Sequence, residues 1–296
     1  MAVLTGDQVA SWKRDGWLLL RRFFDPERLV TARQEMFDLV PTAVEYAATP
    51  ERYRHLVLTQ FSGMRSFPFP GVELSRLCVH EELLSVVGNL LEVDTPLVYQ
   101  AQLWAKYHGA IAYEQTHHRD YAKNTMMVPS ASCAEDFLEA FIYLSDIGPA
   151  DGPTALVSIM LTRHLPLEPA RFSGEEMPFL YENEILALAP RGSVLLYQGN
   201  TFHRATELRR PNGARFGLKL AFKKREATWV TYFEGMRLGF EPDWSIFVRN
   251  ASVRQLEAVG FPKRSDRRWG DSDVISELTL RYDYVPGRKY PNYNPP

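Results

Sequence analysis

Apolar and polar residues alternate along much of the central part of the chain, a pattern typical of β-strands with two different faces. The clearest example runs from Pro96 to Tyr107. Its apolar face takes Tyr99, Ala101, Leu103 and Ala105, and its other face takes Gln100, Gln102 and Trp104. Such a polar face either contacts solvent or lines a polar interior, and the pattern alone leaves both interpretations open.

Further strands are predicted between residues 137 and 222, separated by turns that contain glycine and proline. They are Phe137–Ile147, Thr154–Met160, Glu184–Leu188, Ser193–Tyr197 and the run FGLKLAF at Phe216–Phe222. Lys219 alternates with Leu218 and Leu220 in the last run, so we predict that its side chain points outward. This series of strands predicts a mainly β fold with flanking helices (α+β), built on a barrel.

Helix signals lie on both sides of the predicted barrel. Thr5 to Gln8 forms a capping box that opens a short helix, Gly16 ends it, and the apolar run that follows predicts a strand. Asp25, Pro26 and Glu27 predict a helix that continues to about Tyr46. Other predictions are a loop over the barrel mouth at Glu51–Gly71, a helix at His80–Leu91, and a helix that begins at Asn250 or Ser252 and ends at Val259.

We predict one domain over residues 1–296. It comprises a helical N-terminal part at 1–95, a barrel core at 96–225 and a C-terminal wrap at 226–296. Such barrels commonly fold as one unit of this size.

Composition excludes several classes of function. The net charge of −2 and the pI of about 6.4 predict no nucleic-acid partner. No apolar run approaches the length of a membrane span, and no signal segment precedes the first helix. Two cysteines are too few for a disulfide framework, so we expect a cytoplasmic protein. The oligomeric state has no signature in the sequence.

Three side chains have the pattern of a metal site. His118 and Asp120 are two residues apart, so on a strand they share a face, whereas His117 points the opposite way. A third ligand must arrive from a distant strand, and His203 follows the predicted strand at 193–197. Two imidazoles and one carboxylate form the facial triad of non-haem Fe(II) oxygenases, which leaves coordination positions open. Taken separately, each histidine is more often structural.

Arg215 lies shortly after His203, at the start of an apolar strand. A guanidinium binds a carboxylate through two parallel hydrogen bonds and stays charged when buried. It therefore suits the distal carboxylate of 2-oxoglutarate, which chelates iron next to the site where O2 binds. On the polar face of the 96–107 strand, Gln102 is a candidate contact of this cosubstrate, and Gln100 is a candidate contact of the substrate. Asn124 could also line the site or cap a turn.

At this point the chain resembles the phytanoyl-CoA dioxygenase family of Fe(II)- and 2-oxoglutarate-dependent oxygenases. The resemblance covers most of the chain and is most specific at the triad and Arg215. The matching segments are THHRD, FIYLSDIGPADGPTALVS at Phe141–Ser158, GSVLLYQGNTFHRAT at Gly192–Thr206, NGARFGLKLAF at Asn212–Phe222, and the tail segments SVRQLEAVGFP and LRYDYVPGRKYPNY.

The resemblance implies a double-stranded β-helix (a jelly roll or cupin-like barrel), iron, 2-oxoglutarate and O2. Family members often carry a hydroxyl residue just after the distal histidine. Here Ala205 fills the nearer position, so Thr206 is the candidate cosubstrate contact. Asp120 stands where halogenating relatives have a small residue, which favours hydroxylation or another oxidation of a small-molecule substrate over halogenation.

Two other functions remain open from the sequence. One is a binding protein on the same fold without catalysis, which an intact triad argues against. The other is a cupin-like hydrolase or isomerase that uses zinc or manganese, which would not require Arg215. Fold alone does not separate these functions.

Overall fold

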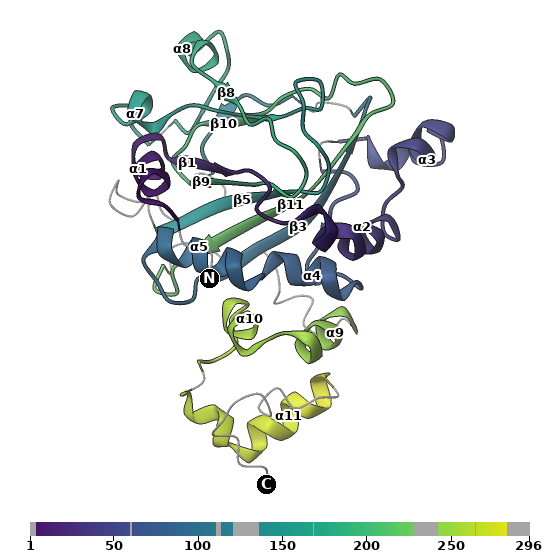
Figure 1. The fold of residues 1–296 in the computed structure, drawn as a ribbon, viewed down its shortest axis with the longest axis vertical. Helices are drawn as coiled ribbons and strands as arrows, with labels where there is room; N and C mark the ends of the chain where they lie inside the picture. The colour runs from purple at the N-terminus through teal and green to yellow at the C-terminus, as the bar shows by residue number, and fades with distance from the viewer. Residues whose placement is uncertain are drawn as a thin grey trace.

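Two antiparallel sheets form the body of the protein (Figure 1). The computed structural model describes residues 4–59, 61–110, 114–120, 136–167, 169–227, 242–263 and 265–282. The major sheet has the order β1-β9-β5-β11-β3-β2, and the minor sheet has the order β7-β4-β10-β6-β8. This arrangement confirms the predicted mainly β fold with flanking helices.

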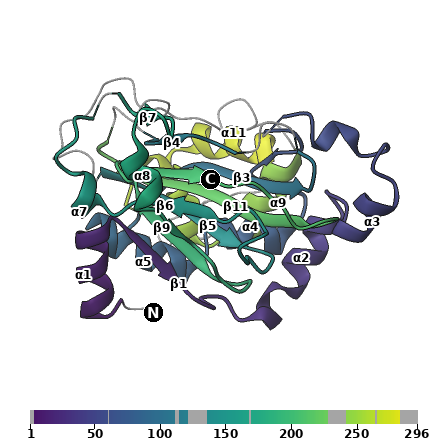
Figure 2. The same ribbon diagram turned by 90° about the horizontal axis from the view of Figure 1, so that it is seen from above.

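Long strands make up the major sheet, and short ones make up the minor sheet. The major sheet contains β1 (Trp17–Leu20), β2 (Arg65–Ser66), β3 (Leu97–Tyr107), β5 (Phe137–Tyr143), β9 (Val194–Gln198) and β11 (Ala214–Lys223). The minor sheet contains β4 (His117–His118), β6 (Thr154–Leu156), β7 (Arg171–Phe172), β8 (Ile185–Leu186) and β10 (His203–Ala205). Figure 2 shows the central strands of the major sheet lying side by side. Two of its strands, β1 and β2, come from the part of the chain before residue 96.

Most of the helices precede β3 or follow β11. They are α1 (Gly6–Asp15), η1 (Pro26–Leu29), α2 (Val30–Phe37), α3 (Ala43–Ala48), η2 (Arg54–Leu56), α4 (Val72–Cys78), α5 (Glu81–Leu91), α7 (Ile159–Thr162), α8 (Pro178–Glu182), α9 (Pro242–Asn250), α10 (Val253–Ala258), η4 (Arg267–Gly270) and α11 (Ser272–Tyr282). None of the described helices is long and apolar enough to cross a membrane.

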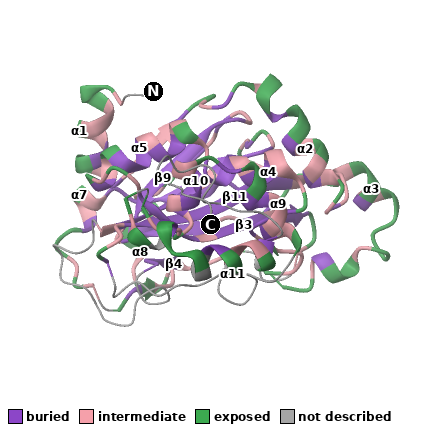
Figure 3. Cartoon of the chain, turned by 90° about the horizontal axis from the view of Figure 1, so that it is seen from below, coloured by how far each residue is buried: buried purple, intermediate pink, exposed green. Residues whose placement is uncertain are grey.

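The largest apolar core lies between the outer face of the major sheet and the helices that cover it. Leu103 of β3 and Leu218 of β11 are fully buried in this cluster, together with Leu83 and Leu84 of α5. Figure 3 shows these strands as buried beneath the helices. Since the outer face provides the hydrophobic burial, the inner face of the same sheet is free to carry polar side chains.

Local signals at the N-terminus produce the predicted elements. Thr5 and Gln8 form the capping box of α1, and Gly16 ends the helix with a φ of 75°. A left-handed residue at this position favours glycine because a side chain would meet the backbone. The following strand, β1, pairs with β9 over four residues, so the start of the chain joins the edge of the major sheet.

The single helix predicted from Asp25 to Tyr46 is wrong. Asp25 accepts a hydrogen bond from Glu27, as expected of an N-cap, but α2 ends at Phe37 and α3 begins at Ala43. Pro41 separates them, because proline lacks the amide hydrogen of a helix and disfavours helical geometry in the preceding residue. Thr42 then caps α3 in a second capping box.

Two strands also differ from the expected pattern. The strand predicted at Thr154–Met160 ends at Leu156, because Ser158 caps the short helix α7. In β3 the pairing with β11 shifts between Ala221 and Phe222, and Tyr99 is the extra residue. This β-bulge turns the Tyr99 hydroxyl to Glu139 on β5, although the alternation had placed Tyr99 on the apolar face.

The C-terminal helices pack on the helices of the N-terminal part. Ser252, one of the two predicted caps, begins α10 in a capping box, and Gln255 donates a hydrogen bond to the carbonyl of Val79. Phe247 and Trp244 of α9 contact Phe67, which precedes α4. The tail therefore belongs to the same apolar core as the outer face of the major sheet.

Candidate functional site

A cavity of about 290 Å³ lies between the two sheets. Strands of the major sheet supply one wall: Gln100, Gln102, Trp104 and Lys106 from β3, and Arg215, Gly217 and Lys219 from β11. Phe61 and Met64 lie at the same cavity, so part of the 51–71 segment covers it, but the segment is not all loop because it contains η2 and β2. The polar face of β3 therefore lines the interior, and the solvent-face interpretation is wrong.

His118, Asp120 and His203 come together on the other wall of the cavity. His118 of β4 is the direct cross-strand partner of His203 on β10. The Oδ1 atom of Asp120 lies 3.8 Å from Nε2 of His118, and its Oδ2 atom lies 3.6 Å from Nε2 of His203. Two atoms that each lie about 2.1 Å from one ion are at most about 4.2 Å apart. Both distances therefore fit a shared metal ion.

Asp120 lies just beyond the strand that was expected to carry it. The strand β4 contains only His117 and His118, and Asp120 follows in a turn. The backbone of the intervening residue is fixed, because the amide of Arg119 donates to the carbonyl of Ala170 at 2.8 Å. The carboxylate still reaches the same side of the sheet as His118.

Hydrogen bonds orient both imidazoles for metal binding. The Nδ1 atom of His118 lies 3.0 Å from the carbonyl of Thr116, and the Nδ1 atom of His203 lies 3.0 Å from the carbonyl of Thr201. An Nδ1 atom that donates to a carbonyl leaves the lone pair on Nε2, which is the atom that faces Asp120. Burial lowers the pKa of His203 to about 3, so this ring is uncharged at neutral pH.

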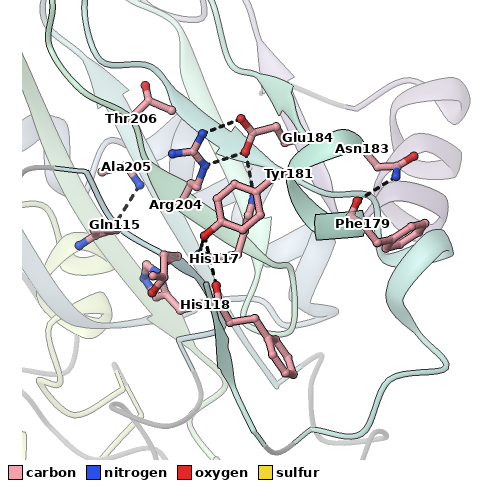
Figure 4. A network of polar contacts seen from close by, with 12 residues as sticks. Gln115, His117, His118, Phe179, Tyr181, Asn183, Glu184, Arg204, Ala205 and Thr206 are labelled. Atoms are coloured by element: carbon pink, nitrogen blue, oxygen red, sulfur yellow. Dashed lines mark hydrogen bonds and ion pairs between the residues drawn. The ribbon is translucent and has the colours of Figure 1, made fainter. Parts of the chain in front are cut away.

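A clamp of charged residues joins the ligand-bearing strands from behind (Figure 4). Glu184 accepts two hydrogen bonds from Arg204, both at 2.7 Å, and lies 2.8 Å from Nε2 of His117. Arg204 adjoins His203, and His117 adjoins His118. Burial raises the pKa of Glu184, but its bonds to Arg204 and His117 outweigh burial and lower the pKa to about 2. His117 therefore points away from the cavity, as predicted.

Arg215 and Lys106 form a cationic end of the cavity. They are direct cross-strand partners on β11 and β3, and both are buried. Arg215 donates hydrogen bonds to the carbonyl of Gly152 and to the hydroxyl of Thr154. Burial and the nearby guanidinium of Arg215 hold the pKa of Lys106 well below its usual value. An anion bound here would be favoured by both side chains.

Lys219 points into the cavity, so the prediction that it faces outward is wrong. It is only 8% exposed, and it donates a hydrogen bond to Glu139, which is completely buried. Its Nζ atom also lies 3.6 Å from Oδ2 of Asp120. Burial raises the pKa of Glu139, and its contact with Lys219 opposes that rise. The buried carboxylate is the physical reason that a lysine is tolerated inside the barrel.

The other predicted site residues are less closely grouped. Gln100 and Gln102 line the cavity, and Gln102 accepts a hydrogen bond from the indole of Trp104 at 2.9 Å. Thr206 donates to the carbonyl of Pro153 at 2.6 Å and is not among the lining residues, whereas Thr154 is. Asn124 lies outside the described residues.

Sequence reasoning missed Lys106, Glu139 and Thr154. Lys106 had a signal, because it continues the inward alternation of Gln102 and Trp104. Glu139 also had a weak one, since it is the acidic residue of an otherwise apolar strand. Thr154 had none, because its place next to Arg215 depends on how the two sheets face each other.

Comparisons with known proteins agree with this geometry. The sequence profile of the phytanoyl-CoA dioxygenase family matches residues 12–214, a region that contains all three triad residues and ends directly before Arg215. No curated protein matches the sequence.

Several solved structures share the fold. The non-haem alpha-ketoglutarate-dependent carbocyclase SnoK from nogalamycin biosynthesis is 17% identical, with a TM-score of 0.59 over 79% of this chain and 90% of SnoK. HygX from Streptomyces hygroscopicus, with nickel and 2-oxoglutarate bound, is 17% identical, with a TM-score of 0.53 over 77% of this chain and 89% of HygX. The epimerase SnoN, in complex with Fe3+, alpha-ketoglutarate and nogalamycin RO, is 15% identical, with a TM-score of 0.52 over 77% of this chain and 86% of SnoN.

Proposed function

The chain belongs to the phytanoyl-CoA dioxygenase family, and from that premise we propose that it is an Fe(II)- and 2-oxoglutarate-dependent dioxygenase. It hydroxylates an unactivated C–H bond of a small-molecule substrate, with succinate and CO2 as co-products. The observation that carries the proposal is the convergence of His118, Asp120, His203 and Arg215 on one cavity between the sheets.

The three triad side chains fit an iron ion. They offer two imidazole nitrogen atoms and one carboxylate, whose oxygen atoms lie 3.8 and 3.6 Å from the Nε2 atoms of His118 and His203. This donor set is the 2-His-1-carboxylate triad that suits Fe(II) and leaves other coordination positions open. Bound iron supplies the activation of O2 that C–H oxidation requires. The protein supplies orientation, through the Nδ1 bonds of both histidines, and a site in which all three side chains are buried.

The cationic end of the cavity fits the distal carboxylate of 2-oxoglutarate. Arg215 lies there with Lys106 beside it, and the hydroxyl of Thr154 is bonded to the guanidinium. Between Arg215 and Lys219, the inward position of β11 is Gly217, which has no side chain to fill the space. A linear dianion can therefore extend along this strand from the triad to the cationic end. In this proposal Gln102 and Thr206 are further candidate contacts of the cosubstrate.

The remaining wall is suited to an uncharged part of the substrate. Phe61 packs edge-to-face on Trp104, with 5.9 Å between the ring centroids, and Trp104 packs in the same way on Phe141, with 6.4 Å between the centroids. Gln100 lines the same cavity and adds an amide to this aromatic wall. Two structural neighbours also have small molecules bound, hygromycin B in HygX and nogalamycin RO in SnoN. Gln100 is thus a candidate substrate contact, and Asn124 stays a prediction.

The test is anaerobic binding of Fe(II) and 2-oxoglutarate, followed by succinate production with a library of small-molecule substrates. The native protein should develop the visible charge-transfer absorption of the iron–2-oxoglutarate complex. The double variant H118A/D120A should lose both this absorption and succinate formation, because two of the three ligands are gone. The matched control is H164A, since His164 is an exposed histidine outside the triad.

Two outcomes would contradict the proposal. Succinate formation that survives in H118A/D120A would show that these residues do not hold the catalytic metal. Tight binding of zinc or manganese by the native protein, with no 2-oxoglutarate-dependent absorption after addition of iron, would instead support a differently metallated cupin-like protein.

A further inference from the structure

We propose that Lys219, held in place by Glu139, is a positioning residue that orients the carboxylate of Asp120 for metal binding. The inference rests on the proposed function, because it concerns the same metal site. It assigns a role to the buried Lys219–Glu139 ion pair, which is neither part of the triad nor part of the cationic end of the cavity.

The geometry places Lys219 between two carboxylates. On one side it donates to Oε2 of Glu139, and on the other its Nζ atom lies 3.6 Å from Oδ2 of Asp120. Tyr99 donates to the second oxygen of Glu139 at 2.9 Å. Glu139 is therefore bonded at both oxygens, and it fixes the position of the ammonium group that faces Asp120.

This arrangement is costly in a protein interior. A buried carboxylate and a buried ammonium each lose their hydration, and an apolar pair of similar volume would often be at least as stable. Three strands contribute to it: β5 carries Glu139, β11 carries Lys219, and the bulge of β3 turns Tyr99 inward. A buried ion pair of this kind is expected at a functional site, where it has a role beyond stability.

Asp120 differs from the two histidines of the triad in its backbone setting. It lies beyond the end of β4, whereas His118 and His203 are held in paired strands. Each histidine has a backbone carbonyl at its Nδ1 atom, at 3.0 Å in both cases. Lys219 contributes an ion pair to the carboxylate, with 3.6 Å between Nζ and Oδ2, and outer groups of this kind fix the orientation of ligating carboxylates.

Positioning and simple electrostatics predict opposite effects on metal affinity. A positive charge near the site repels a divalent cation, so removal of Lys219 should strengthen metal binding if charge alone matters. If Lys219 orients Asp120, its removal should weaken binding, by about 10- to 100-fold as for other outer partners of metal ligands.

The experiment measures Co(II) affinity by titration of the metal-free protein, with Co(II) as the probe. The main variant is the double substitution K219M/E139Q, which removes one charge of each sign and so leaves the net charge of the core unchanged. The single variant K219R should keep most of the native Co(II) affinity, because arginine keeps a cation beside Glu139 and Asp120. The control is K223M, which removes another buried lysine of β11 that donates to the carbonyl of Ala227 and does not line the cavity.

We expect K219M/E139Q to bind Co(II) about 10- to 100-fold more weakly than the native protein and to alter the d–d spectrum of the bound ion. K219R and K223M should stay close to the native value. Thermal unfolding of the metal-free forms shows whether each variant is folded.

The inference and the proposed function fail in different ways. If the native protein binds Co(II) and a folded K219M/E139Q binds it equally or more tightly, the positioning role is overturned and the function stands. If K219R binds as weakly as K219M/E139Q, charge at this position is not what holds Asp120, and the inference is likewise overturned. If the native protein binds neither Co(II) nor Fe(II), the proposed function itself fails.

Discussion

Individual side chains in this protein derive their chemistry from a second group that holds them. His118 and His203 present Nε2 because a carbonyl accepts from Nδ1. Arg215 keeps its guanidinium in the cavity because Gly152 and Thr154 accept from it. The residue type supplies the chemistry, and the partner selects the atom that faces the cavity.

At this scale we predict that Arg215 determines affinity for 2-oxoglutarate. The variant R215M should bind the cosubstrate about 10- to 100-fold more weakly, since a charge-assisted hydrogen bond contributes about 1.5–3 kcal/mol. Metal affinity should be unchanged, because the guanidinium contacts no triad residue among the described contacts. Titration of 2-oxoglutarate into the metal-loaded protein measures the effect.

R215K provides a finer test of the same site. Lysine keeps the charge but loses the planar fork, so we expect only partial recovery of affinity. The control is R209M, which changes an exposed arginine of the preceding turn. Native-like affinity in R215M would place the cosubstrate carboxylate elsewhere.

At the scale of elements, the proposed metal site depends on two very short strands. The strands β4 and β10 pair at His118 and His203, and such a short ladder has few hydrogen bonds of its own. Glu184 bonds to a residue of each strand on the opposite face, and Tyr181 contacts both of those residues through its ring. The clamp therefore stabilises the relative position of the two proposed metal ligands, His118 and His203, through the residues next to them in the chain.

We predict that E184Q lowers the free energy of unfolding by about 1–3 kcal/mol, because hydrogen bonds to a charged acceptor become bonds to a neutral one. Urea unfolding of the metal-free protein at pH 7 measures this change. E182Q is the matched control, since Glu182 is exposed at the end of α8. Equal loss of stability in both variants would contradict the clamp.

The same clamp predicts an effect of acid. The pKa of Glu184 is lowered from 4.5 to about 2, so its contribution to stability is complete above pH 4.5. That contribution should be lost as the pH falls from about 4.5 toward 2, because protonation then removes the charge that Arg204 pairs with. The difference in stability between native protein and E184Q should shrink over this interval.

For the whole molecule, the largest apolar core and the polar cavity occupy opposite faces of one sheet. The outer face of the major sheet carries the apolar core with the helices, and the inner face carries the polar cavity. The C-terminal helices α9 and α10 extend the outer core. Substitutions in that core should therefore change stability without changing the metal site.

We predict that F247A lowers the free energy of unfolding by about 3–5 kcal/mol, the usual range for a buried phenylalanine. Phe247 is 3% exposed and packs on Phe67 at 4.7 Å, so its loss leaves a cavity between the tail and the region before α4. Urea unfolding measures the loss, and Co(II) affinity of the folded variant should be native. F179A is the control, since Phe179 is 38% exposed and should matter much less. A large loss of Co(II) affinity in folded F247A would contradict this separation.

Patterns between residues close together in the sequence were sufficient to predict many of the helices and strands. The capping boxes at Thr5 and Ser252, the helix of α5 and the long strand β3 all depend on neighbours within a few residues. The His118, Asp120 and His203 set and Arg215 could be nominated for the same reason, because residue type and spacing along a strand restrict metal ligands and carboxylate-binding groups.

The tertiary structure alone decided what those patterns left open. Alternation along β11 separates two faces but does not show which of them is inside, so the outward prediction for Lys219 was wrong. Its inward position depends on Glu139, which the neighbouring strand β5 places beside it. The bulge at Tyr99 and the place of Thr154 next to Arg215 likewise depend on pairing between distant strands. A buried charge is stable only beside its partner, and that partner comes from another part of the chain.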